Sequence, residues 1–72
     1  MGAKKKATAS SRVQRFNSQN KIGTRVRVTR IDNTKFETNT RYVAFVSDSG
    51  YPVILIDGVA TPYNISLVEV IQ

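Results

Sequence analysis

Polar and apolar residues alternate over residues 24–30, and this alternation constrains the fold more than any other feature of the chain. Apolar side chains at every second position are typical of a strand with one face on a core and the other in solvent. Val26 and Val28 are therefore predicted to face the core. Arg25 and Arg27 are predicted to project from the opposite, outer face of the same strand.

More strands are predicted in the remainder of the chain, because short β-branched and aromatic segments alternate there with turn residues. These predicted strands cover residues 41–46, 51–56, 59–63 and 67–71. Asp48-Ser49-Gly50 and Asp57-Gly58 are the turns between them. Residues 35–40 are expected to form a long polar loop, and residues 64–66 a single 3₁₀ turn. The predicted fold class is all-β, a small five-stranded antiparallel barrel over residues 22–72.

This order of elements resembles that of the SH3-like barrels, the group that includes Tudor and KOW domains. The resemblance rests on Gly23-Thr-Arg-Val-Arg-Val at the first strand and on Tyr63-Asn-Ile-Ser-Leu-Val-Glu-Val-Ile at the end. It covers residues 22–72 and concerns the fold pattern, not a functional motif. The loop after Arg30 lacks the Gly-rich turn of a KOW motif. The type II dihydrofolate reductases are similar barrels, but their Val-Gln-Ile-Tyr stretch is replaced here by residues 60–63, Ala-Thr-Pro-Tyr.

Residues 1–21, which end at Lys21, differ in composition from the remainder of the chain. They contain few large apolar side chains: Met1, Val13 and Phe16. Such a segment buries too little apolar area to offset the ~1–2 kcal/mol per residue that ordering a backbone costs. We therefore expect residues 1–21 to be a flexible basic arm, disordered in isolation. A short helical turn over residues 11–16 is expected on binding. The chain then divides into this arm and the barrel of residues 22–72.

The net charge of +6, from eleven Lys and Arg against five Asp and Glu, is concentrated in the arm. Residues 1–21 contain six basic and no acidic residues, whereas residues 22–72 contain five of each. Basic side chains bind the phosphates of nucleic acids and release condensed counterions. The candidate nucleic-acid-binding residues are Lys4, Lys5, Lys6, Arg12, Arg15 and Lys21 in the arm, and Arg25, Arg27, Arg30, Lys35 and Arg41 in the barrel.

Other polar and aromatic side chains of the arm fit the same function. Phe16 and the amides Gln14, Asn17, Gln19 and Asn20 are candidates for insertion into a groove or for stacking on exposed bases. The arm also fits a solubilising tail or a segment that docks on an acidic protein. Arg25 and Arg27 also fit a solvated strand face with cross-strand pairs to Glu37 or Glu69.

Catalysis is not expected from this composition. The chain contains neither Cys nor His, which removes disulfides, thiol nucleophiles, the commonest general base and the commonest metal ligand. Asp32, Asp48 and Asp57 lie in separate predicted turns, so turn chemistry explains them. A methyl-reading cage needs several aromatic residues, and the candidates are Phe36, Tyr42, Phe45, Tyr51 and Tyr63. We predict no catalytic residue, no cofactor and no metal site.

The sequence therefore predicts a non-enzymatic protein that binds DNA or RNA through phosphate contacts with low sequence selectivity. The alternative is a protein-interaction module that binds a host transcription or translation component, as a phage or mobile-element accessory protein does. No apolar run approaches the ~20 residues that span a bilayer, so a cytoplasmic protein without a membrane partner is expected. We expect a monomer or a small homo-oligomer. Ile54, Leu55, Ile56, Val68 and Val70 exceed what a small core requires and are candidates for the interface of an oligomer.

Overall fold

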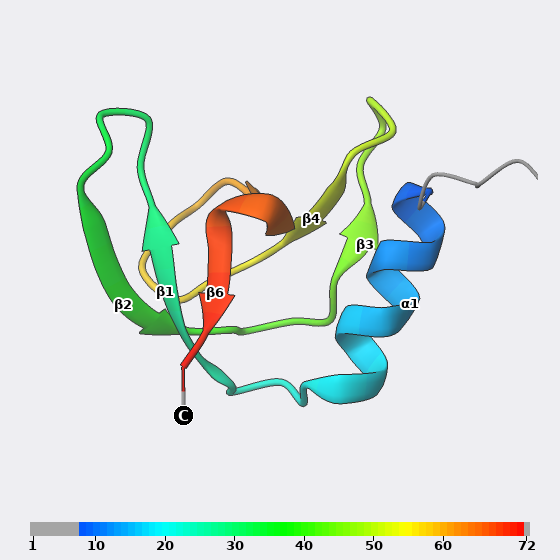
Figure 1. Cartoon of the computed structure of the whole chain (residues 1–72), viewed down its shortest axis with the longest axis horizontal. Helices are drawn as coiled ribbons and strands as arrows, with labels where there is room; N and C mark the ends of the chain where they lie inside the picture. Colours follow the sequence, from blue (N-terminus) through cyan, green and yellow to red (C-terminus); the bar gives the residue numbers. More distant parts are fainter. Residues whose placement is uncertain (1–7, 72) are drawn as a thin grey trace, which may run out of the picture.

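The computed structural model describes residues 8–71, which form one α-helix, six strands and one 3₁₀ turn (Figure 1). In chain order these elements are α1 (Ala9–Gln19), β1 (Arg25–Thr29), β2 (Lys35–Asn39), β3 (Phe45–Val46), β4 (Pro52–Ile54), β5 (Tyr63–Asn64), η1 (Ile65–Leu67) and β6 (Val68–Val70). The predicted strand-rich body is confirmed. The count of five strands is not.

The strands form two small antiparallel sheets that an isolated bridge joins. β1 lies between β2 and β6 in the first sheet, and β4 lies between β3 and β5 in the second. Thr40 and Ile56 pair in the bridge. Over residues 8–71 the two sheets do not close into a barrel, so the predicted closed barrel is wrong. Closure fails because the second sheet is short: β3 and β5 contain two residues each, and only β4 between them has three.

Residues 35–39, predicted as part of a loop, form strand β2 and pair with β1 over its whole length. This prediction was wrong because the outer face of the β1–β2 hairpin is solvated and accepts polar residues. The register places Phe36 opposite Val28, and it places Glu37 opposite Arg27. One apolar side chain on the inner face was therefore enough for strand pairing. The predicted strand at residues 59–63 is also wrong for all but Tyr63, because residues 59–62 form no ladder.

Helix α1 corrects the prediction that residues 1–21 are disordered, which is wrong for residues 9–19. Thr8 caps the helix N-terminus, since its Oγ1 accepts a hydrogen bond from the Ser11 amide at 3.0 Å. At the other end, the backbone and side-chain nitrogens of Asn20 both donate to the carbonyl of Phe16 at 3.0 Å. Residues 1–7 of the predicted arm lie outside the described residues.

Packing against the sheets is what stabilises α1, because an isolated helix of this length is marginal in water. Val13 and Phe16 pack on the hydrophobic core, and α1 contacts β3 and β4. The Asn17 side chain forms two hydrogen bonds with the backbone of Ala44, one as donor and one as acceptor, as the backbone of a paired strand does. Its Nδ2 donates to the Ala44 carbonyl at 3.0 Å, and its Oδ1 accepts from the Ala44 amide at 2.8 Å.

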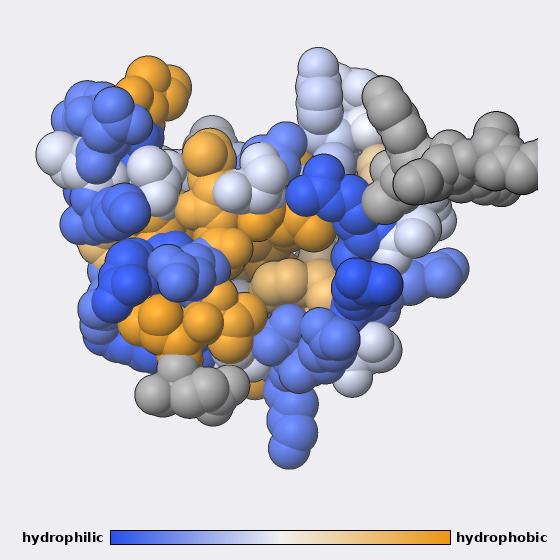
Figure 2. All heavy atoms as spheres, viewed as in Figure 1, coloured by the Kyte–Doolittle hydropathy of each residue, from blue (hydrophilic) through white to orange (hydrophobic). Residues whose placement is uncertain are grey.

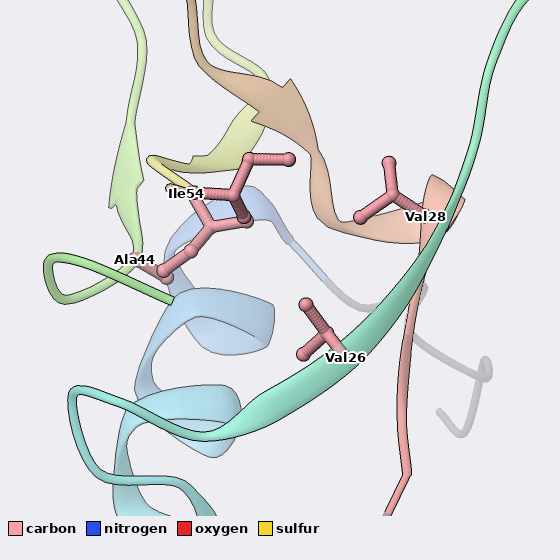
Figure 3. Packing of buried hydrophobic residues seen from close by; sticks show 5 residues of the cluster. Val26, Val28, Ala44 and Ile54 are labelled. Atoms are coloured by element: carbon pink, nitrogen blue, oxygen red, sulfur yellow. The ribbon is translucent and has the colours of Figure 1, made fainter. Parts of the chain in front are cut away.

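The hydrophobic core lies between the two sheets and α1. Val26 and Val28 point from β1 toward Ile54 of β4 (Figure 3), and these three side chains and Ile56 are completely buried. The predicted inward face of β1 is therefore confirmed. Ile54 and Ile56 belong to the core of a single chain, so their burial is explained without an oligomer.

The tip of the β1–β2 hairpin is an Asx turn built on Asp32. The Asp32 carboxylate accepts hydrogen bonds from the Thr34 hydroxyl at 2.6 Å and from the Thr34 amide at 3.1 Å. Asn33 takes the left-handed backbone conformation, with φ of 71°, which Asn tolerates better than most residues. The turn predicted at Asp32 is confirmed.

These hydrogen bonds, first of all the one from the Thr34 hydroxyl, hold the pKa of Asp32 below its ordinary value of 3.8. A carboxylate with a lowered pKa stabilises the folded state above pH 3.8, and this contribution is lost as the pH falls through the lower, folded value. We expect the Asp32 side-chain carbon to titrate below 3.8 in an NMR titration. The pKa should rise in Thr34→Ala. A midpoint for Asp32 unaffected by Thr34→Ala contradicts the prediction.

Candidate nucleic-acid interface

The two arginines on the outer face of β1 are paired with carboxylates. The guanidinium group of Arg27 lies 3.4 Å from the carboxylate of Glu37 on β2 and 3.5 Å from that of Glu69 on β6. The guanidinium group of Arg25 lies 3.6 Å from the carboxylate of Glu37. These are the cross-strand pairs of the alternative interpretation of Arg25 and Arg27. All four side chains are partly exposed to solvent, so each pair stabilises the fold little, by about 0–1 kcal/mol. The pairs do neutralise most of the positive charge of this face.

Two other candidate residues have structural partners. Arg30 lies over the ring of Phe36, 4.1 Å from its centroid, in a cation–π contact. The Arg41 side chain donates hydrogen bonds to the carbonyls of Ile56 at 3.3 Å and Val59 at 3.2 Å. These contacts hold the β1–β2 hairpin and the loop after Ile56 in place.

The remaining described candidates are Arg12, Arg15, Lys21 and Lys35, and within residues 8–71 none of them forms an ion pair. All four are exposed. Lys21 follows α1 and Lys35 begins β2, so they lie at different places in the fold. Lys4, Lys5 and Lys6 lie outside the described residues.

Arg12 and Arg15 line a groove between α1 and η1. The groove has a volume of about 350 Å³, and its lining residues are Ser11, Arg12, Arg15, Phe16, Gln19 and Ile65. Successive positions three and four apart lie on one face of a helix, so Arg12, Arg15 and Gln19 project on the same side of α1. No acidic residue lines the groove. An anion that enters it meets two guanidinium groups without a competing carboxylate.

Apolar side chains form part of the groove surface. Phe16 and Ile65 pack against the core with part of their surface and line the groove with another part. Figure 2 shows apolar side chains gathered in the middle of this face, around a hollow between β6 and α1, with strongly hydrophilic side chains over α1. The groove therefore combines an apolar surface with a basic and amide-bearing helix face.

Sequence reasoning missed Ile65, Ser11 and the groove itself. The helical spacing of Arg12, Phe16 and Gln19 was a usable signal, but the sequence supported only the short helical turn expected over residues 11–16, which lies within α1. The amides Asn17 and Asn20, considered for base contacts, are engaged with the backbone of Ala44 and Phe16 instead.

The aromatic residues of the strands form two separate pairs. Phe36 and Tyr63 meet edge to face at 6.3 Å between ring centroids, and Tyr42 and Phe45 do so at 6.4 Å. Tyr51 belongs to neither pair. Between residues 8 and 71 these side chains therefore do not converge into a cage of several rings.

Within residues 8–71, no three Asp or Glu side chains come together in a group that could hold a metal ion. Over the same range, α1 is too short and too polar to cross a membrane.

Comparisons of the chain with protein-family models, curated proteins and solved structures gave no match. The geometry of the groove and the placement of its charges are therefore the observations that bear on its function.

Proposed function

We propose that this protein binds nucleic acid through the exposed face of α1, without catalysing a reaction on it. The observation that carries the proposal is the pair Arg12 and Arg15, which are exposed and form no ion pair within residues 8–71. They line a groove to which no acidic residue of this range contributes. Guanidinium groups bind phosphate oxygens in bidentate geometry. The three lysines at positions 4–6 add positive charge to the same end of the chain.

This proposal shifts the interface away from β1. Arg25 and Arg27 have carboxylate partners, and a phosphate must compete with Glu37 and Glu69 for them. Arg12 and Arg15 have no such competition. Most of the binding energy is expected from phosphate contacts, so the affinity falls steeply with salt and depends little on sequence.

We also propose that the fold is a relative of the SH3-like barrels. The order of a hairpin, β3 and β4 joined by a tight turn, then β5, a 3₁₀ turn and a last strand beside β1 supports this relationship. The open side next to α1 departs from a closed barrel. Because such folds serve many functions, this relationship adds nothing to the functional proposal.

The test compares two double variants that remove equal charge. Arg12→Gln with Arg15→Gln should bind labelled DNA or RNA more weakly than the wild type. The slope of log K against log salt should become shallower by about 1.4 for a single strand or about 1.8 for a duplex, as expected for two lost phosphate contacts. Fluorescence anisotropy at several salt concentrations measures both quantities.

The matched control is Arg25→Gln with Arg27→Gln. It lowers the net charge by the same amount, but on the outer face of β1. It should change the salt slope by much less than the α1 double variant. Equal losses of affinity and of salt slope in the two double variants would show that only the net charge matters. That result would overturn the assignment of the interface to α1. Absence of binding by the full chain at low salt rejects nucleic acid as the ligand and favours an acidic protein partner.

A further inference from the structure

We infer that the groove between α1 and η1 accepts an unpaired base, so that the protein selects single-stranded over double-stranded nucleic acid. This inference rests on the proposed function and adds the kind of strand that the site prefers. It concerns the apolar part of the groove, which phosphate binding alone leaves unused.

The first reason is the combination of surfaces in the groove. Arg12 and Arg15 line the groove and are the groups that contact phosphates in the proposed function. A charged phosphate gains no binding free energy from the apolar surface of Phe16 and Ile65, which lines the same groove. A base offers a flat apolar face that stacks on aromatic and aliphatic side chains, whatever its identity. A strand that places phosphates on the helix face and a base in the groove therefore uses both parts of the lining.

The second reason is access. In a duplex the faces of the bases are stacked on one another, and only their edges reach the grooves. The surface formed by Phe16 and Ile65 lies in a recess, about 350 Å³ in volume, rather than on a protruding ridge. A recess of this kind accepts a base that swings out of a flexible strand and excludes one that stays within a helix.

The third reason is the polar group at the edge of the recess. Gln19 lies on the same helix face as Arg12 and Arg15 and lines the groove with them. Its amide is not engaged in any hydrogen bond within residues 8–71. An amide can both donate to and accept from the edge of a base, so it tolerates every base and fits low sequence selectivity.

The experiment compares three probes with the wild-type chain at one salt concentration: oligothymidylate about ten nucleotides long, an abasic deoxyribose-phosphate strand of equal length, and a duplex of that length. The two single strands carry the same phosphates. We expect oligothymidylate to bind about 5- to 150-fold more tightly than the abasic strand, the range of a single stacked base. It should also bind more tightly than the duplex.

The position of the base is read by NMR on the same complexes. The ring protons of Phe16 and the methyl protons of Ile65 should shift with oligothymidylate and shift much less with the abasic strand. Phe16→Leu keeps the side chain apolar and removes the ring, so it should reduce the ratio between the two single-stranded affinities. Circular dichroism of Phe16→Leu establishes that α1 and the strands are retained.

The outcomes separate the two proposals. Equal affinities for oligothymidylate and the abasic strand overturn the base site and leave phosphate binding intact. Preference for oligothymidylate with shifts at the Phe36–Tyr63 pair instead of Phe16 and Ile65 also overturns it. Failure of all three probes to bind rejects the proposed function itself.

Discussion

Replacing Ile54 by alanine is expected to unfold most of the protein at 25 °C. The Ile54 side chain is completely buried between the sheets, in contact with the core valines of β1. Truncating a buried isoleucine to alanine costs about 2–5 kcal/mol, through lost transfer free energy and the cavity that remains. A single small core in a chain of this length supplies only about 3–5 kcal/mol of stability. The loss is therefore comparable to the whole free energy of unfolding.

Urea denaturation followed by circular dichroism measures this effect. Ile54→Val removes one methyl group and should cost about 0.5–1.5 kcal/mol, which leaves a measurable transition. The matched control is Ile31→Ala, because Ile31 at the tip of the β1–β2 hairpin is 99% exposed. Its truncation should change the free energy of unfolding by less than about 0.5 kcal/mol. Similar transitions for Ile54→Ala and Ile31→Ala contradict the proposed core.

Replacing Asn17 by alanine is expected to loosen α1 from the body of the protein. The substitution removes both hydrogen bonds to Ala44 and leaves the buried amide and carbonyl of Ala44 without these partners. An unsatisfied buried polar group costs about 1–3 kcal/mol. Native-state hydrogen exchange of the α1 amides should accelerate by about 5- to 150-fold as a result. The amides of β1 should change less.

Gln14→Ala is the control, because Gln14 is exposed on α1 and alanine is the stronger helix former. Its exchange rates should stay near those of the wild type. Neither substitution changes the net charge, so the pair also tests the groove. Asn17→Ala should reduce the preference for oligothymidylate over the abasic strand, while phosphate-driven binding persists. Equal exchange in the two variants would show that Asn17 does not hold α1 in place.

Local patterns in the sequence determined much of the β-rich body. Alternation alone assigned Val26 and Val28 to the core, because the side chains of a strand alternate between its two faces. The turn at Asp32 was predictable for a similar reason, since an Asx turn depends only on neighbouring residues. The concentration of basic residues before residue 22 is also a property of the sequence alone.

Contacts between distant residues decided the rest. The stretch from Ala9 to Gln19 is a helix because Val13 and Phe16 reach the core and Asn17 binds a backbone 27 positions away. Neither interaction has a local signature. The same docking brings Phe16 beside Ile65 and creates the groove, and strand pairing gives Arg27 its two carboxylates. The sequence thus determined how much charge the chain carries, and the tertiary structure decided which of those charges remain unpaired, because pairing depends on which strands and helices become neighbours.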